Sequence, residues 1–280
     1  MVENRPFLTV LTHLFLIAGV IVVIFPVYIA VVAATHGPLA LSSGAMPMLP
    51  GSELINNIMQ VLTETRRGVA PFWLMAWNSL MMAVLITVGK IAISIISAYA
   101  IVYFRFPGRL LVFWLIFITL MLPVEVRIIP TFKVVADLGL LNSYAGLTIP
   151  LIASATATFL FRQFFMTIPD ELMEAARVDG AGPMKFFRDI LLPLSRTNIA
   201  ALCVILFIYG WMQYLWPLLV TTDPKYYTLM MGVKRMATVA DSDPQWNIIM
   251  AAVVLAMLPP VLIVIFMQRL FVKGLVETEK

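Results

Sequence analysis

Charged side chains are rare in the apolar stretches of this 280-residue chain, so the few that occur there are the first candidates for chemistry. Lys90 is the only charged residue between Arg67 and Arg105. Burying an ionisable group in a membrane-length apolar run costs several kcal/mol, so such a group usually faces a bundle interior or a watery path. Lys90 therefore has two interpretations. It either reaches an interface or a buried partner, or it offers a positive charge to an anionic solute such as a phosphate monoester.

Two further pairs of polar residues lie in or beside apolar runs. Gln213 and Tyr214 belong to the polar and aromatic stretch 210–217, which is either a belt at the headgroup level or part of a pathway. We predict that both side chains face the pathway. Glu125 and Arg127 are spaced i, i+2, so they do not face each other on a regular helix. This spacing favours a gating or rim role for the pair over contact with solute.

Several other chemistries have no residues to support them. A phosphate-binding loop needs a glycine five positions before Gly-Lys and a Ser or Thr after it, and Gly89-Lys90 has neither. The two histidines, His13 and His36, are too far apart in sequence for a local metal motif, and Cys203 is the single cysteine. The sequence therefore predicts no catalytic residue, no metal site and no cofactor bound by this chain itself.

The composition is that of an integral membrane protein. Hydrophobic residues make up 61% of the chain and charged residues 12%, with a mean hydropathy of +0.97. A soluble domain carries about 25% charged residues, so polar side chains here are too few to cover a water-facing surface. The formal net charge of +4 is typical of loops anchored on the inner side of a membrane, and we predict no nucleic-acid partner.

Apolar runs long enough to cross a bilayer predict an all-α protein with six transmembrane helices and a single membrane domain. The first run is about twice the length of a signal-peptide core, which indicates a retained anchor. The third run is the least regular, because Glu125 and Arg127 interrupt it and Pro123 can kink it. An outer loop over 36–70 is expected to contain a surface helix between Glu53 and Glu64. The predicted spans are residues 7–34, 73–103, 110–130, 138–162, 197–220 and 246–269.

The distribution of Lys and Arg sets the predicted orientation. The tight turn Arg105–Arg109 places two arginines between the second and third spans, and the segment between the fourth and fifth spans carries several more basic residues. Cytoplasmic loops are enriched in Lys and Arg. We therefore expect both termini to lie in the cytoplasm.

Residues 169–193, in that inner segment, predict two short helices joined by a tight turn. Pro169 suits a helix start, and Gly180 can adopt the left-handed conformation that ends a helix. Asp170 and Glu171 then place negative charge at the positive end of the first helix. Pro183 is expected to open the second helix and Pro193 to close it.

The second helix is expected to be amphipathic. Met184, Phe187 and Leu191 are spaced i, i+3, i+7, so a regular α-helix would present them on one face. By itself, such a helical pair is equally consistent with an ordinary loop lying on the membrane surface.

The order of residues in this segment is more specific than its helical pattern. Glu174-Ala175-Ala176 is followed after two residues by Asp179-Gly180-Ala181, and then after eight residues by Ile190-Leu191-Leu192-Pro193. This pattern resembles the EAA loop of ATP-binding-cassette importer permeases at every defined position. The resemblance covers nearly the whole chain and is closest to the smaller permease subunit of carbohydrate-type importers, in particular that of sn-glycerol-3-phosphate importers. Supporting stretches are residues 1–6, 117–127, 143–167 and 209–218.

The resemblance implies a type I importer permease in a bacterial inner membrane. Its partners would be a dimer of ATP-binding-cassette ATPases that bind ATP and Mg²⁺, a second related permease, a periplasmic substrate-binding protein and membrane lipid. The residues implied to couple this chain to the ATPase are Glu174, Ala175, Ala176, Asp179, Gly180 and Ala181. The chain would thus be a mechanical element and not an enzyme.

The resemblance also implies a cargo, sn-glycerol-3-phosphate and glycerophosphodiesters. A neutral sugar or oligosaccharide carried by the same machine remains the alternative. A carrier driven by an ion gradient is a third hypothesis, but it would need charged relays in several spans, and only Lys90 is deeply placed. A membrane-embedded enzyme is disfavoured because no nucleophile and base are paired.

Overall fold

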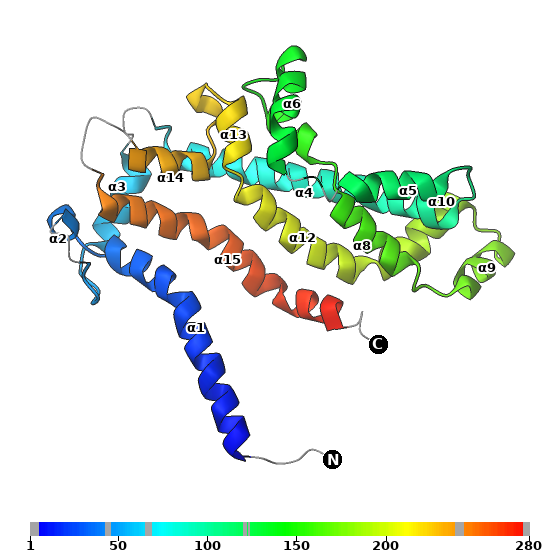
Figure 1. Ribbon diagram of the computed structural model, residues 1–280, viewed down its shortest axis with the longest axis horizontal. Helices are drawn as coiled ribbons and strands as arrows, with labels where there is room; N and C mark the ends of the chain where they lie inside the picture. Colours follow the sequence, from blue (N-terminus) through cyan, green and yellow to red (C-terminus); the bar gives the residue numbers. More distant parts are fainter. Residues whose placement is uncertain are drawn as a thin grey trace. The chain divides into compact units, whose positions relative to one another are not determined.

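The computed structural model describes residues 6–42, 46–64, 69–119, 122, 124–238 and 244–276, and every regular element within these ranges is helical (Figure 1). Three helices are long and apolar enough to cross a membrane: α1 (Pro6–Ala34), α4 (Phe72–Tyr103) and α15 (Trp246–Val276). Two bent helix pairs raise the number of possible spans among the described residues to five. The all-helical membrane fold expected from the composition is confirmed.

Contacts divide the chain into two compact units, of which the first contains residues up to Trp73 and Gly232–Leu258. Its core includes a buried amide: Asn57 Nδ2 donates to the carbonyl oxygens of Ala34 and His36 at 2.8 Å each, and Asn57 Oδ1 accepts from Asn247 Nδ2 at 2.8 Å. These bonds tie the end of α1 to α3 and α15. The helices of this unit are α1, α2 (Pro38–Ser42), α3 (Leu54–Thr63), most of α14 (Leu229–Thr238) and the first part of α15.

Helix α3 confirms the surface helix predicted between Glu53 and Glu64. Residues 43–45 and 65–68 of the predicted outer loop lie outside the described residues.

The second unit consists of Leu74–Met231 and the chain from Pro259 onward, and it contains all the predicted site residues. Its elements are most of α4, α5 (Arg109–Ile118), α6 (Val124–Asp137), α7 (Tyr144–Thr148), η2 (Ile149–Leu151), α8 (Ala155–Phe165), α9 (Asp170–Val178), α10 (Pro183–Phe186), η3 (Phe187–Leu191), α11 (Leu192–Leu194), α12 (Arg196–Trp211), α13 (Leu215–Val220), η4 (Pro224–Tyr226) and the last part of α15.

The third to fifth predicted spans are not single straight helices. In the region 110–130, α5 ends at Ile118 and α6 begins at Val124, while residues 120, 121 and 123 lie outside the described residues. In the fourth, the segments 144–151 and 155–165 meet at 46°, where the Ser154 hydroxyl accepts from Ala157 N at 3.3 Å and caps α8. In the fifth, the chain leaves helical geometry between Trp211 and Leu215.

Small residues bring the long helices of the second unit close together. A Cβ atom added to Gly210 on α12 would lie 2.8 Å from Ala83 Cα on α4, and one added to Gly89 would lie 2.6 Å from Ile152 Cγ2. Such close approaches are typical of helix packing in membranes, where contact relies on van der Waals fit. Two buried clusters surround these crossings. One joins α4, α6, α7 and α13, and the other joins α4, α8, α12 and the segment 173–192.

Candidate functional site

The turn between α9 and α10 is built by the motif residues themselves. Asp170 and Glu171 lie in the first turn of α9, and Gly180 has φ +73°, as the sequence predicted. Ala181 N donates to Ala176 O at 2.8 Å, and Gly180 N donates to Arg177 O at 3.0 Å. This pair of bonds is the Schellman arrangement, which satisfies the last carbonyls of a helix through a left-handed residue. A side chain at Gly180 would therefore be strained whatever space surrounds it.

The motif residues divide into an inner and an outer set. Ala176 is buried at 5% exposure in the cluster formed with α4, α8 and α12, and Ala181 packs against that cluster. The outward-facing motif residues are Glu174, Ala175, Asp179 and Gly180. Two large apolar side chains beside them, Val178 and Met184, are 87% and 73% exposed. The inner alanines thus seat the turn on the bundle, while its outer surface is left uncovered by the part of the chain that the structure describes.

The second helix of the segment departs from the predicted pattern. The prediction that Met184, Phe187 and Leu191 share one face is wrong, because Met184 is 73% exposed whereas Phe186 and Leu191 are buried, at 5% and 0% exposure. Residues Phe187–Leu191 form a π-helix, in which each turn is closed by an i to i+5 hydrogen bond. A turn of this helix holds more residues than the 3.6 of an α-helix, so the i, i+7 register that would have aligned Met184 with Leu191 is lost.

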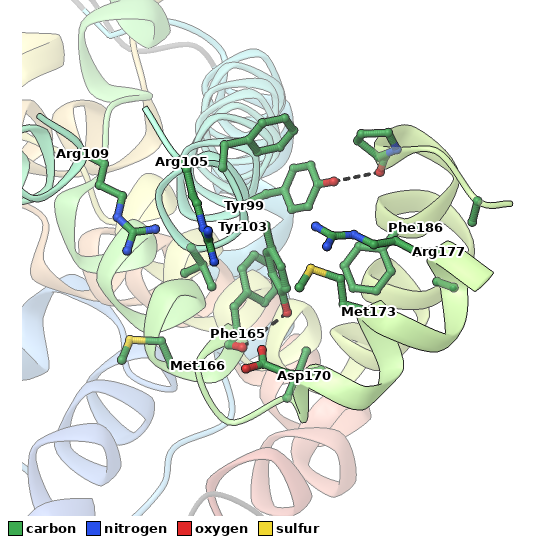
Figure 2. A pocket seen from close by; sticks show the side chains of 16 residues that line it. Tyr99, Tyr103, Arg105, Arg109, Phe165, Met166, Asp170, Met173, Arg177 and Phe186 are labelled. Carbon is green, nitrogen blue, oxygen red and sulfur yellow. Dashed lines mark hydrogen bonds between the residues drawn. The ribbon is translucent and has the colours of Figure 1, made fainter. Parts of the chain in front are cut away.

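Two tyrosines near the end of α4 hold the segment in place. Tyr99 Oη donates to Pro183 O at 2.8 Å, and its ring lies 4.9 Å from that of Phe187. The Tyr103 ring lies 5.3 Å from Phe186, and Tyr103 Oη donates to Phe165 O at 3.4 Å (Figure 2). We did not predict a role for these tyrosines, although their i, i+4 spacing just before Arg105 places both on one face of α4.

A cavity of about 830 Å³ opens at this junction (Figure 2). Its walls come from the end of α4, the turn at Arg105 and Arg109, the end of α8, and the α9–α10 segment. Its charged lining consists of Arg105, Arg109, Arg177 and Asp170. The apolar lining includes Phe104, Phe165, Met166, Met173 and Phe186.

The other group of candidates meets in the interior of the second unit. Lys90 is only 7% exposed, and its Nζ lies 4.0 Å from the centre of the Tyr209 ring. Gln213 Nε2 donates to Tyr209 O at 3.2 Å, which places the amide one helical turn from that ring. A cation over an aromatic face is stabilised by the ring quadrupole, but the ring does not neutralise the charge. The structure therefore joins Lys90 and Gln213 through Tyr209, a residue that we did not single out from the sequence.

The remaining candidates lie around this centre. Tyr214 is half-buried at the start of α13. Arg127 is exposed on α6, and its positive charge acts on Lys90 and Tyr209. The side chain of Glu125 lies outside the described residues. Among the described residues, no group of three or more His, Cys, Asp or Glu side chains could hold a metal ion.

Comparison with known proteins identifies the family that most of this sequence matches. Residues 90–277 match the family described as "Binding-protein-dependent transport system inner membrane component". The sn-glycerol-3-phosphate transport system permease protein UgpE of Salmonella typhi is 60% identical over 281 residues, and the protein of the same name from Escherichia coli (strain K12) is 58% identical over 281 residues. Each of these comparisons covers 100% of both chains.

Solved structures share the fold. A bacterial ABC transporter involved in the import of the acidic polysaccharide alginate matches with a TM-score of 0.83 at 20% identity, over 96% of this chain and 98% of that chain. A structure of the bacterial alginate ABC transporter in complex with an alginate pentasaccharide-bound periplasmic protein matches with a TM-score of 0.64 at 17% identity, over 94% and 93%. At these identities the similarity concerns the architecture alone.

Proposed function

Because the chain belongs to the family of inner-membrane components of binding-protein-dependent transport systems, we propose that it forms half of the import pathway for sn-glycerol-3-phosphate, with glycerophosphodiesters as further cargo. The chain is a transport permease. The support for the cargo is the 58–60% identity, over full length, to permeases named for sn-glycerol-3-phosphate transport.

The observation that carries the mechanism is the construction of the segment 169–193. Its inner residues are fastened to the bundle, while Glu174, Val178 and Met184 point outward and are not buried by any described residue. Exposed large apolar side chains beside charged ones are typical of a protein interface. We infer that this outer surface docks on an ATPase subunit that binds ATP and Mg²⁺, so closure of the ATPase dimer moves the segment.

The rest of the proposed assembly follows from having only half of a pathway in one chain. A second, related permease would supply the other half, and a periplasmic binding protein would deliver the solute from outside. The segment between the fourth and fifth spans must then face the cytoplasm, which puts both termini on the same side. The bias of Lys and Arg toward these loops supports this orientation.

In the interior, we propose that Lys90 faces the solute path. A buried ammonium group that rests on an aromatic ring keeps its charge available to an anion, and a phosphate monoester can accept hydrogen bonds from it. Gln213 and Tyr214, at the break after α12, would add neutral hydrogen-bonding groups for the glycerol hydroxyls. Glu125 and Arg127 would act at the rim or gate.

The decisive experiment is to reconstitute the complete complex in liposomes and measure ATP hydrolysis with the binding protein and different solutes. We expect sn-glycerol-3-phosphate to stimulate hydrolysis and a neutral oligosaccharide to leave it at the basal rate. Stimulation by the neutral sugar alone would overturn the cargo assignment. Uptake by this chain without an ATPase, driven by an ion gradient, would overturn the importer mechanism.

The coupling role has its own test in the double variant Gly180→Pro with Glu174→Arg. Proline fixes φ near −65°, which is incompatible with the +73° at this turn, and the second change reverses an outward charge. We expect solute-stimulated ATP hydrolysis and uptake to be lost. Gly182→Ala is the matched control, because Gly182 has φ −71° and open space around an added Cβ atom. Normal transport by the double variant would contradict the coupling role.

A further inference from the structure

The cavity at the junction of α4 and the α9–α10 segment has an excess of positive charge. Three arginines, Arg105, Arg109 and Arg177, line it together with a single carboxylate, Asp170. The one ion pair found between described residues is elsewhere, between Arg188 Nε and Asp189 Oδ1 at 3.8 Å. No guanidinium group of the cavity is therefore neutralised by a carboxylate of the described residues within ion-pair distance.

The three arginines belong to two different parts of the unit. Arg105 and Arg109 flank the turn after α4, while Arg177 lies on α9, and Figure 2 shows Arg105 and Arg177 on either side of the Tyr103 ring. Guanidinium groups bind phosphate oxygens through paired hydrogen bonds, more specifically than ammonium groups do. An anion placed between them would bridge the helical bundle and the segment 169–193, called the coupling segment below.

The remainder of the cavity and its surroundings are apolar. Its volume of about 830 Å³ lies within the range of roughly 300–1,000 Å³ typical of small-molecule sites. Two large apolar side chains of the lining, Phe104 and Met166, are 42% and 56% exposed, so an apolar surface continues from the cavity to its outside. A ligand with a phosphate head and long hydrocarbon chains would match both features, with the head among the arginines and the chains over Phe104 and Met166.

We propose that this cavity binds the headgroup of an anionic phospholipid. The lipid would fasten the coupling segment to the end of α4 and the start of α5. Basic pockets between transmembrane helices at the cytoplasmic side are the kind of site that anionic headgroups occupy. A phosphatidylglycerol head would place its phosphate between Arg105, Arg109 and Arg177, and its glycerol hydroxyls can donate to the Asp170 carboxylate. The apolar lining beside the arginines favours a lipid over free phosphate, which has no hydrocarbon part, and over an acidic protein segment. Only the cytoplasmic placement of the cavity rests on the proposed function.

The test measures lipid retention by the purified full-length protein in detergent, using native mass spectrometry. Dioleoylphosphatidylglycerol is titrated against dioleoylphosphatidylcholine, which has the same acyl chains and no net charge. We expect the anionic lipid to be retained preferentially. In the variant Arg105→Gln with Arg109→Gln, its retention should fall roughly tenfold or more, since each basic contact to an anionic headgroup contributes measurably. Equal retention of the two lipids by the unmodified protein would overturn the proposal.

Arg188→Gln is the matched control, because Arg188 lies on the same segment but outside the cavity and its side chain is 83% exposed. If the control and the double variant lost retention of the anionic lipid equally, the proposed site would be wrong. Circular dichroism of each variant checks that the helices are intact, and Arg177→Gln alone provides a second, milder variant.

Two further arms identify the source of the anion. Millimolar inorganic phosphate should not displace the lipid, and displacement would show a general anion site instead. Addition of the ATPase partner should leave the lipid bound, whereas its release in proportion to complex formation would assign the cavity to an acidic segment of that partner. Because lipid retention needs no ATP hydrolysis, a failed lipid experiment leaves the importer function intact, and a failed transport experiment leaves the lipid site intact.

Discussion

Lys90 lies against the Tyr209 ring, and the structure gives it no carboxylate partner among the described residues. A cation held in this way retains most of its capacity to attract an anion, because the aromatic quadrupole stabilises charge without cancelling it. The positive charge of Arg127 also contributes to the electrostatic environment of Lys90. Like charges repel, so an anion beside Lys90 would be favourable. This is the physical reason to connect Lys90 with a phosphorylated solute.

The residue-scale prediction concerns Lys90→Ala. Loss of a hydrogen bond to a charged group costs about 1.5–3 kcal/mol, so kcat/KM for sn-glycerol-3-phosphate uptake should fall about ten- to a hundredfold. Lys90→Arg, which keeps the charge, should retain more activity than the alanine variant. The measurement is uptake by proteoliposomes, with basal ATP hydrolysis as the check on assembly.

Lys133→Ala supplies the comparison at an exposed lysine on α6. It should transport normally. Equal uptake by Lys90→Ala and the unmodified protein would remove Lys90 from the pathway.

At the scale of elements, the second unit depends on close crossings of helices. Helix α12 approaches α4 where Gly210 faces Ala83, and the same two helices carry Tyr209 and Lys90 to each other a short distance away. A wider separation would therefore disturb both the packing and the interior polar group. The absence of a side chain at Gly210 is a requirement of this geometry.

Gly210→Val is accordingly expected to destabilise the protein. The added atoms would overlap the α4 backbone, and overpacking of this kind typically costs about 1–3 kcal/mol. The apparent melting temperature in detergent should fall. Gly19→Val, in the middle of α1, is the control, since a Cβ atom there has no neighbour within 4 Å. Equal melting temperatures for the two variants would contradict the close crossing.

The sequence predicted the local parts of the coupling segment better than its packing. The position of Gly180 and the acidic start of α9 follow from rules that act within one helical turn, and both are confirmed. The π-helix at Phe187–Leu191 was not predicted, because its wider turn depends on which side chains the surrounding helices bury. The partnership of Lys90 with Tyr209 was missed for a similar reason: it joins residues from different helices, and a single sequence does not reveal their contact.

At the scale of the whole molecule, the order of apolar runs predicted the membrane class correctly. It did not predict that some of the spans are bent. The described helices instead include bent pairs and a short apolar helix, α5. Breaks at Ser154 and between Trp211 and Leu215 occur where polar groups or proline interrupt the ladder of backbone hydrogen bonds. Such interruptions are tolerated in a membrane only where protein or water satisfies the freed backbone groups.

The orientation of the chain in the membrane can be tested by labelling single cysteines. In a Cys203→Ser background the chain has no cysteine, so single cysteines can be placed at Ser52 and at Lys185, both of which are exposed. In intact spheroplasts, an impermeant maleimide should label Ser52→Cys, which lies in the predicted outer loop. It should label Lys185→Cys only after the membrane is opened. The reverse pattern would invert the predicted topology and exclude an ATPase at the coupling segment.

Helix α12 has a mechanical consequence because of where it begins and ends. It starts one residue after the segment Pro183–Leu194, from which it diverges by 70°, and the buried Ser195 hydroxyl fastens this corner by donating to Leu191 O at 2.6 Å. Near its other end it carries Tyr209, about 20 Å away at the rise of an α-helix. The helix could thus act as a rigid lever that turns about the corner at Ser195. In the proposed importer, a small rotation at this corner is expected to produce a larger displacement of the ring that covers Lys90, so the exposure of that charge would follow the movement of the segment 169–193.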